Sequence, residues 1–215
     1  MISLDLARSL PAKPTILCLG AHADDIEIGC GGTLLRLLRT RKDVSVRWAV
    51  FSATPVRARE AQAAAAIFLK RARAKEVRIH AFADGHFPYQ GAEIKEVFEG
   101  IKRGPAPDLV FTHYRDDRHQ DHRMISDTTW QTFRESLVLE YEIPKYDGDL
   151  GSPNVFLSLD APTCERKIRA LLRSYPTQHA KPWFTEETLR ALLRLRGIEA
   201  RARYAEAFYG RKLVL

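Results

Sequence analysis

Residues 14–33, PTILCLGAHADDIEIGCGGT, constrain the fold of this chain more than any other part of it. A short apolar run stops there at Gly20, and three side chains that can ligate metals or exchange protons follow at once: His22, Asp24 and Asp25. A glycine-rich segment and an amphipathic run come next. This order is typical of a buried strand, a polar loop and the start of a helix. In open α/β sheets ligands bind beyond the carboxyl ends of the strands, so we expect this loop to border a binding crevice.

A second stretch, residues 111–123, repeats the layout. The apolar run of residues 109–111 leads into a loop that is dense in imidazoles and carboxylates: His113, Asp116, Asp117, His119, Asp121 and His122. Two strand ends that carry histidine and aspartate can face each other across such a crevice. We interpret the two stretches together as a mononuclear metal site.

The hydrophobic pattern along the chain predicts strands that alternate with helices. Strands are expected over residues 14–21, 44–51, 76–83, 108–112, 138–143 and 154–159, with a last one at a sheet edge within 203–215. Helices are expected over residues 30–41, 57–73, 92–103, 121–136, 161–174 and 185–196, with a short leading helix or arm in 1–13. This alternation favours an α/β fold: a Rossmann-like, doubly wound, mostly parallel sheet with helices on both faces. We expect residues 1–215 to form one domain.

The composition is that of a soluble globular protein, with 45% hydrophobic and 28% charged residues. No apolar stretch reaches the length of a membrane span, and the first residues, MISLDLARSLPAKP, lack the pattern of a secretory signal. The three cysteines are odd in number and well separated, which does not suggest a disulfide framework. These features together predict a cytoplasmic protein.

The net charge of +7 and the pI of about 9.4 invite the hypothesis of a nucleic-acid partner. The arginines are spread over several predicted helices, however, and aromatic residues are sparsely interleaved with them. Spread arginines are more often a solvated, salt-bridged surface, so we expect no nucleic-acid partner. A sugar-phosphate or nucleotide-sugar substrate would also tolerate a positive surface.

The histidines and aspartates of the two stretches match the donor set of a catalytic zinc ion, which takes three protein ligands and leaves one position open. His22 and Asp25, three residues apart in a turn, can reach one ion, and His122 would complete the set. Asp24 would then lie beside the ion without binding it. A carboxylate in that place suits a general base that accepts a proton from the activated water.

His119 lies three residues before His122 and has Asp121 nearby. A buried aspartate that accepts from an imidazole fixes its tautomer and raises its basicity. His119 could therefore polarise a carbonyl, stabilise a developing oxyanion or protonate a leaving amine. The spacing leaves these three roles open.

Each of these residues also has an interpretation that involves no metal. His22 could be a satisfied histidine at a strand end, the Asp24–Asp25 pair could cap a helix, and the loop residues Asp116 and Asp117 are interpreted as solvated. The metal site is favoured because both clusters follow predicted strands and the first continues into a glycine-rich segment.

These residues resemble the PIG-L/LmbE-like N-deacetylase family, which uses zinc to hydrolyse N-acetyl groups of amino sugars. The resemblance rests on residues 22–33, HADDIEIGCGGT, and 119–123, HQDHR, with weaker similarity in 57–60 and 204–208. It spans almost the whole chain. One departure is Ala23, where the family usually has proline; the missing ring loosens the loop but removes no ligand.

The resemblance implies a role for each residue of the two motifs. It makes His22, Asp25 and His122 the ligands of one zinc ion, Asp24 the base, and the His119–Asp121 pair the electrostatic and acid partner. The implied reaction is hydrolysis of the N-acetyl amide of a small-molecule amino sugar. Self-association as a homo-oligomer is expected only on the same family grounds.

Other residues are weaker candidates. Arg57, at the start of a predicted helix, could contact substrate hydroxyls or phosphate, or could simply be exposed. Asp84, His86 and Tyr89 could line the rim of the site, and the polar loop at residues 146–149 could cover it.

Two alternative functions stay open on sequence grounds. One is a metal-dependent hydrolase of another amide or of a phosphoester, for which Asp24, Asp116 and Asp117 could supply the bridging carboxylates of a two-metal site. The other is a non-catalytic sugar-binding protein, which would have no use for Asp24. The ligand set also suits divalent metals other than zinc.

Overall fold

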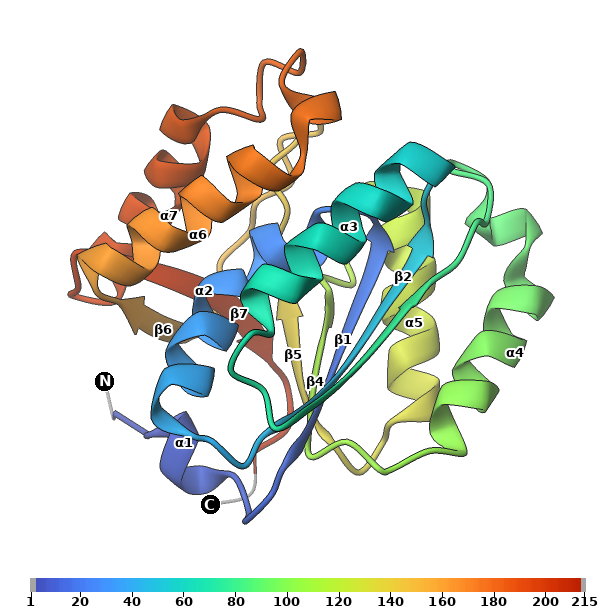
Figure 1. The fold of residues 1–215 in the computed structure, drawn as a ribbon, viewed down its shortest axis with the longest axis horizontal. Helices are drawn as coiled ribbons and strands as arrows, with labels where there is room; N and C mark the ends of the chain where they lie inside the picture. The colour runs from blue at the N-terminus through green and yellow to red at the C-terminus, as the bar shows by residue number, and fades with distance from the viewer. Residues whose placement is uncertain (1–2, 214–215) are drawn as a thin grey trace.

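Parallel strands with a continuous apolar run, as in residues 16–21, need cover on both faces, and the structure supplies it. This computed structural model describes residues 3–213 and has one seven-stranded sheet with helices on either side (Figure 1). The strands are β1 (Thr15–His22), β2 (Ser45–Ser52), β3 (Ala74–Ile79), β4 (Leu109–His113), β5 (Leu137–Tyr141), β6 (Val155–Leu159) and β7 (Tyr204–Gly210). The helices are α1 (Leu6–Ser9), α2 (Asp25–Thr40), α3 (Pro55–Phe68), α4 (Gly91–Lys102), α5 (Gln120–Thr132), α6 (Ala161–Ser174) and α7 (Glu186–Glu199), with 3-10 turns η1 (Phe87–Tyr89) and η2 (Pro176–Gln178).

The order of the strands creates the crevice that the sequence predicts. It is β3-β2-β1-β4-β5-β7-β6, with β1 to β5 parallel and β7 antiparallel to both of its neighbours. The chain builds outward from β1 to β3 and then returns to place β4 on the other side of β1. The loops that follow β1 and β4 therefore diverge, and ligands bind at such a switch point.

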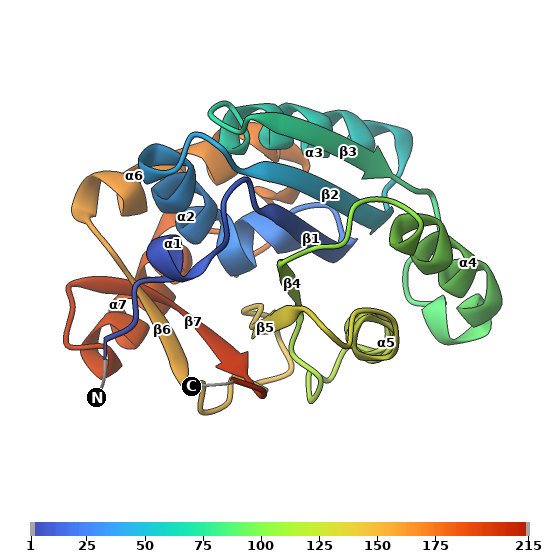
Figure 2. The same cartoon turned by 90° about the horizontal axis from the view of Figure 1, so that it is seen from below.

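Helices cover both faces of the sheet (Figure 2). One hydrophobic cluster packs the sheet against α2, α3, α6 and α7, and a second packs it against α4 and α5. The predicted α/β architecture, mostly parallel with helices on both faces, is confirmed.

Helix α2 begins at Asp25, five residues earlier than the predicted helix over 30–41. Glycine lowers helix propensity by about 1 kcal/mol relative to alanine, so its glycine-rich first half resembles a loop. Tertiary packing overrides that preference: a Cβ atom at Gly29 would lie 2.2 Å from the Tyr141 ring, and one at Gly31 would lie 2.6 Å from Phe68. The glycines allow the start of α2 to pack closely, and they bring Asp25 into the first helical position.

The predicted edge position of the last strand is wrong. Strand β7 lies between β5 and β6, so β6 and β3 form the edges of the sheet. Its residues from Tyr204 to Tyr209 are all buried, including Glu206, a charged residue that the sequence pattern favours at the surface. The predicted strand also included residues 214–215, which lie outside the described residues.

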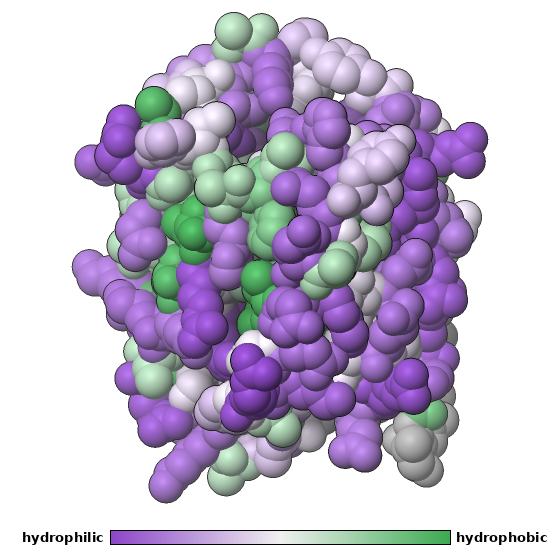
Figure 3. Space-filling model, turned by 90° about the vertical axis from the view of Figure 1, so that its right-hand side faces the viewer, coloured by the Kyte–Doolittle hydropathy of each residue, from purple (hydrophilic) through white to green (hydrophobic). Residues whose placement is uncertain are grey.

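The surface agrees with the charged composition. Polar side chains cover most of the face drawn in Figure 3 and surround a smaller apolar area. Within residues 3–213, none of the helices combines the length and the apolarity needed to cross a bilayer.

Candidate metal centre

Three side chains from separate elements converge at the switch point. His22 is the last residue of β1, Asp25 is the first residue of α2, and His122 lies in the first turn of α5. His22 Nδ1 lies 3.2 Å from His122 Nε2 and 3.5 Å from Asp25 Oδ2, and His122 Nε2 lies 3.7 Å from Asp25 Oδ2. Tetrahedral ligands about 2.0–2.2 Å from a zinc ion stand about 3.3–3.6 Å apart. The three atoms are therefore close enough together to hold one divalent metal, and their role as ligands stays a prediction.

A strained residue turns the chain between His22 and Asp25. Asp24 has φ 98° and ψ −22°, a left-handed conformation that is uncommon for residues other than glycine. The backbone N–H of His22 donates to Asp25 Oδ2 over 2.6 Å, which holds the two candidate ligands on one side of the turn. Strain of this kind is typical of functional sites.

The carboxylate of Asp121 pairs with His22, although the sequence suggested His119 as its partner. Asp121 Oδ2 lies 3.2 Å from His22 Nε2, and the Asp121 carboxylate also accepts from the backbone N–H groups of Gly85 and Phe87. His119 Nδ1 instead accepts from the backbone N–H of Asp121, over 3.3 Å, as the N-cap of α5. Because the His119 side chain hydrogen-bonds to the backbone at the start of α5, it does not occupy the Asp121 carboxylate. That carboxylate is therefore free to contact Gly85 and Phe87 in the loop after β3.

Asp117 is buried against His122, so its interpretation as a solvated residue is wrong. It is 2% exposed, and its Oδ2 lies 2.9 Å from His122 Nδ1 and 2.9 Å from Lys145 Nζ. Burial opposes ionisation, but the His122 hydrogen bond and nearby cations hold the pKa of Asp117 well below its ordinary value. Asp116 is exposed, as expected.

His113, to which the sequence assigned no individual role, is fully buried next to the Asp25 carboxylate. Its Nε2 accepts from the backbone N–H of Ala21 over 2.9 Å and lies 3.2 Å from Asp25 Oδ2. Burial opposes ionisation of Asp25, but the adjacent His122 and His113 keep its pKa well below the ordinary value. Burial, with His113 nearby, lowers the pKa of His122 to about 4, which keeps this imidazole neutral and able to ligate a metal. Every candidate ligand thus has a buried neighbour that orients it.

Arg57 lies against Asp24. Its Nη2 is 3.0 Å from Asp24 Oδ2 and also donates to the Ala23 carbonyl, while Nη1 pairs with Glu60 over 3.1 Å. The guanidinium packs on the Tyr175 ring, 4.9 Å from its centroid, and the side chain is 16% exposed. Burial raises the pKa of Asp24 to about 7, against the opposing effect of Arg57. Contact of Arg57 with a substrate stays a prediction, whereas its contact with Asp24 is observed.

A second carboxylic acid lies behind Asp24. Glu27 is fully buried, accepts from the Tyr175 hydroxyl over 2.5 Å, and has its pKa raised to about 8 by burial. At neutral pH it is mostly protonated, so it adds little negative charge behind Asp24 and Asp25. The position of Glu27 in the first motif did not indicate that it would be a buried and mostly protonated acid.

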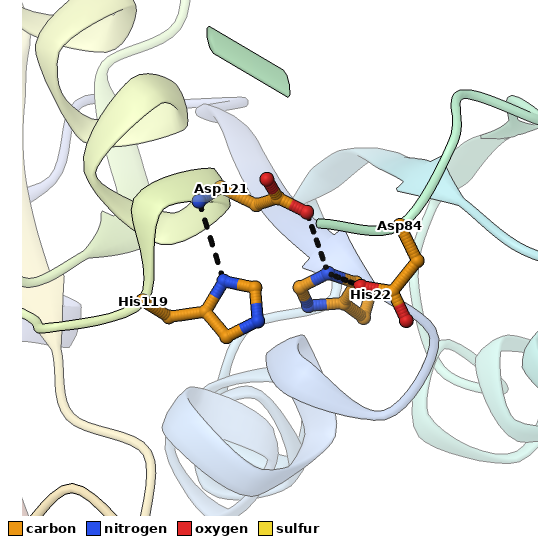
Figure 4. A group of neighbouring side chains, drawn as sticks. All are labelled: His22, Asp84, His119 and Asp121. Atoms are coloured by element: carbon orange, nitrogen blue, oxygen red, sulfur yellow. Dashed lines mark hydrogen bonds and ion pairs between the residues drawn. The ribbon is translucent and has the colours of Figure 1, made fainter. Parts of the chain in front are cut away.

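The side chains of His22, Asp84, His119 and Asp121 lie together on one side of the site (Figure 4). The His119 ring stands edge-on to His22, with centroids 4.8 Å apart, and Asp84 Oδ1 lies 3.0 Å from His22 Nε2. His86 and Tyr89, the other predicted rim residues, are exposed on the same loop as Asp84.

The predicted covering loop is tied to the second motif. Lys145 Nζ bridges Asp117 and Asp149, and Asp149 Oδ2 accepts from the backbone N–H of Arg118 over 2.7 Å. Tyr146, at the exposed end of this loop, is 73% exposed. The loop is therefore anchored next to His122 through its ion pairs.

Comparisons with known proteins identify the family and show which structures share the fold. The family model described as PIG-L, GlcNAc-PI de-N-acetylase, matches residues 17–133 and so includes both motifs. A conserved protein from Thermus thermophilus has a similar structure, with a TM-score of 0.73 and 22% identity over 94% of this chain and 96% of that one. So does the N,N'-diacetylchitobiose deacetylase from Pyrococcus horikoshii, with a TM-score of 0.72 and 21% identity over 93% of this chain and 84% of that one.

The same fold also occurs in a protein with another activity. The 4-carboxy-2-hydroxymuconate hydratase from Pseudomonas putida matches with a TM-score of 0.69 and 16% identity, over 94% of this chain and 98% of that one. Likeness at these identities establishes the fold alone, so function has to be argued from the side chains of the site.

Proposed function

The chain belongs to the PIG-L family, and from this premise we propose that it is a zinc-dependent hydrolase that removes the N-acetyl group from an amino sugar or amino-sugar conjugate. The observation that carries the proposal is the convergence of His22, Asp25 and His122 on one point beside the buried carboxylate of Asp24. The substrate class follows the family's description and the similar fold of a diacetylchitobiose deacetylase.

The donor set supports one metal ion held by His22 Nδ1, Asp25 Oδ2 and His122 Nε2. Two imidazoles and one carboxylate suit zinc, and they also accept other divalent ions. When bound, the metal supplies Lewis acidity toward the acetyl carbonyl and the attacking water.

Asp24 is the proposed general base. Its Oδ2 is buried and, among residues 3–213, has no hydrogen-bond donor other than the ion-paired Arg57, so it is available to a water proton. A pKa of about 7 is close to the optimum for a base that works at neutral pH. Most of the guanidinium contacts of Arg57 go to Ala23, Asp24 and Glu60, so we propose that Arg57 mainly positions this base.

His119 is the proposed oxyanion partner. Because its Nδ1 accepts from the Asp121 backbone N–H, the proton of the neutral ring is on Nε2, where it can be donated to the tetrahedral oxygen. Burial and the neighbouring His22 lower the pKa of His119, which favours this neutral form. Asp24, having taken a proton from water, can then pass it to the departing amine.

The two-metal phosphoesterase alternative loses support in the structure. It needs carboxylates that bridge two ions, and Asp117 is instead committed to His122 and Lys145, while Asp116 is exposed. The sugar-binding alternative is also disfavoured, because a protein that only binds sugars needs no general base such as Asp24.

The proposed function is tested by acetate release from a panel of N-acetylated amino sugars. Protein loaded with one equivalent of zinc should release acetate, lose the activity with a chelator, and regain it when zinc is restored. Parallel assays with a generic phosphomonoester and with amides other than N-acetyl test the alternatives. Zinc-loaded protein that releases no acetate from any sugar of the panel would contradict the proposed reaction.

Asp117→Asn should weaken zinc binding by about 10- to 100-fold, the usual cost of losing the partner that orients a histidine ligand. The amide keeps the shape but not the charge that fixes His122 through Nδ1. Competition with a chromogenic chelator measures the dissociation constant. Asp116→Asn, one residue away and exposed, is the matched control and should bind zinc as the wild type does.

A further inference from the structure

The guanidinium of Arg57 is held by two different parts of the chain. One of its terminal nitrogens, Nη2, meets the turn between β1 and α2, where it lies 3.0 Å from Asp24 Oδ2 and donates to the Ala23 carbonyl. The other, Nη1, lies 3.1 Å from Glu60 Oε2 and 3.2 Å from Thr177 Oγ1. The guanidinium is a rigid planar fork, so contacts that fix Nη1 also fix the position of Nη2 against Asp24.

Glu60 is the residue that holds the Nη1 side. It lies one helical turn after Arg57 in α3 and is 8% exposed. Its Oε1 accepts from the backbone N–H of Thr177 over 3.0 Å, and its Oε2 accepts from the Thr177 hydroxyl over 2.6 Å while pairing with Arg57. Hydrogen bonds to a carboxylate are among the stronger ones in proteins, and three donors leave this carboxylate little freedom to turn. Glu60 thus joins the start of α3 to Thr177 in η2, 117 residues further along the chain.

This pair gives a role to a part of the sequence that the proposed reaction leaves unused. Residues 57–60 are one of the two weaker similarities in the sequence, and they supply both members of the ion pair. Ordering a long arginine side chain costs rotamer entropy, and a fixed carboxylate one turn away on the same helix offsets that cost. Asp24 Oδ2 has no other donor among residues 3–213, so its orientation depends on where Arg57 stands.

We propose that Glu60 is a positioning residue of this enzyme: it holds Arg57 in place, and Arg57 in turn orients the Asp24 carboxylate. The contacts of the Glu60 carboxylate are with Arg57 and Thr177, so it acts on the reaction through Arg57. The proposal rests on the proposed function, in which Asp24 is the general base. A catalytic group displaced by about 1 Å can lose about 100-fold in rate, which sets the scale of the expected effect.

Glu60→Gln is the direct test, because the amide keeps the size of the side chain and can still accept from the Thr177 N–H, but has no charge to pair with Arg57. With zinc bound, kcat for acetate release should fall by at least about fivefold and up to about 100-fold, while KM stays at the wild-type value. Loss of a substrate contact would instead raise KM. Glu96→Gln, at an exposed glutamate of α4, is the matched control and should retain the wild-type kcat. A smaller loss of kcat in Glu60→Gln, or a loss confined to KM, would overturn the proposal.

A double-mutant cycle separates an effect through Arg57 from a plain structural tie between α3 and η2. Side chains that act as a unit give non-additive losses, so Glu60→Gln should cause no further loss of kcat in an Arg57→Met background. Arg59→Met, at an exposed arginine of the same helix, is the control for Arg57→Met and should leave kcat unchanged. If Glu60→Gln costs the same factor with and without Arg57, Glu60 acts by another route and the proposal is wrong.

The ordering of Arg57 can also be measured without any substrate. Rotation about the Cζ–Nε bond is slow in a guanidinium that is held on both sides, so its two Nη groups give separate nitrogen NMR signals, which merge when the group rotates freely. In zinc-loaded wild type the signals of Arg57, assigned by their loss in Arg57→Met, should be separate, and in Glu60→Gln they should merge. If no sugar is deacetylated, the proposed function fails while this measurement still decides whether Glu60 holds Arg57. Separate signals in Glu60→Gln would overturn the proposal whatever the activity.

Discussion

Asp24→Asn is expected to lower kcat for N-acetyl hydrolysis by about 100- to 10,000-fold, the contribution typical of a positioned general base, while the protein keeps its zinc. Asparagine has the same shape as aspartate but cannot accept the proton of the attacking water. It also tolerates the left-handed conformation at φ 98°, so the turn between His22 and Asp25 should persist.

The measurement is steady-state acetate release, with the zinc content of each preparation recorded. Asp127→Asn, at an exposed aspartate of α5, is the control for loss of a negative charge and should retain wild-type kcat. A variant that holds one zinc and keeps kcat within about tenfold of wild type would remove Asp24 from the role of base.

Lys167→Met is expected to lower the free energy of unfolding by about 3–5 kcal/mol, the usual cost of leaving one member of a buried ion pair uncompensated. Lys167 Nζ lies 2.6 Å from Glu206 Oε1 and 2.5 Å from the Ile28 carbonyl, and both side chains are almost fully buried. The Glu206 carboxylate also accepts from the backbone N–H groups of Gly32 and Thr33, inside α2. The pair therefore joins α6, β7 and the helix that begins with Asp25.

Denaturant unfolding of the metal-free proteins isolates this effect, because zinc binding would add its own stabilisation. Arg166→Met, an exposed neighbour on α6, should change stability by no more than about 0.5 kcal/mol. The double variant Lys167→Met/Glu206→Gln should recover part of the loss, since no unpaired charge stays buried. A loss below about 1 kcal/mol in Lys167→Met would contradict the assigned role of the pair.

The sequence by itself determined the fold class and the local part of the site. Strand and helix periodicities depend on neighbouring residues, so the alternation of strands and helices that is typical of a doubly wound sheet can be predicted from the sequence. His22 and Asp25 are three residues apart in one turn, and their proximity is a local matter as well. His122, 100 residues from His22, was assigned by the second motif, and the parallel pairing of β1 with β4 brings it there.

Only the tertiary structure decided which charges are buried and with what partner. Asp121 contacts His22, Asp117 binds His122 and Lys145, and Glu206 reaches into α2 across 174 residues of chain. From sequence, Asp117 was interpreted as solvated and Asp121 was paired with His119, because burying a charge is costly unless a partner compensates it and the partners are not visible along the chain. Those partners come from distant segments. Whether these partners come into contact depends on how the layers of the fold pack, and no local sequence pattern indicates it.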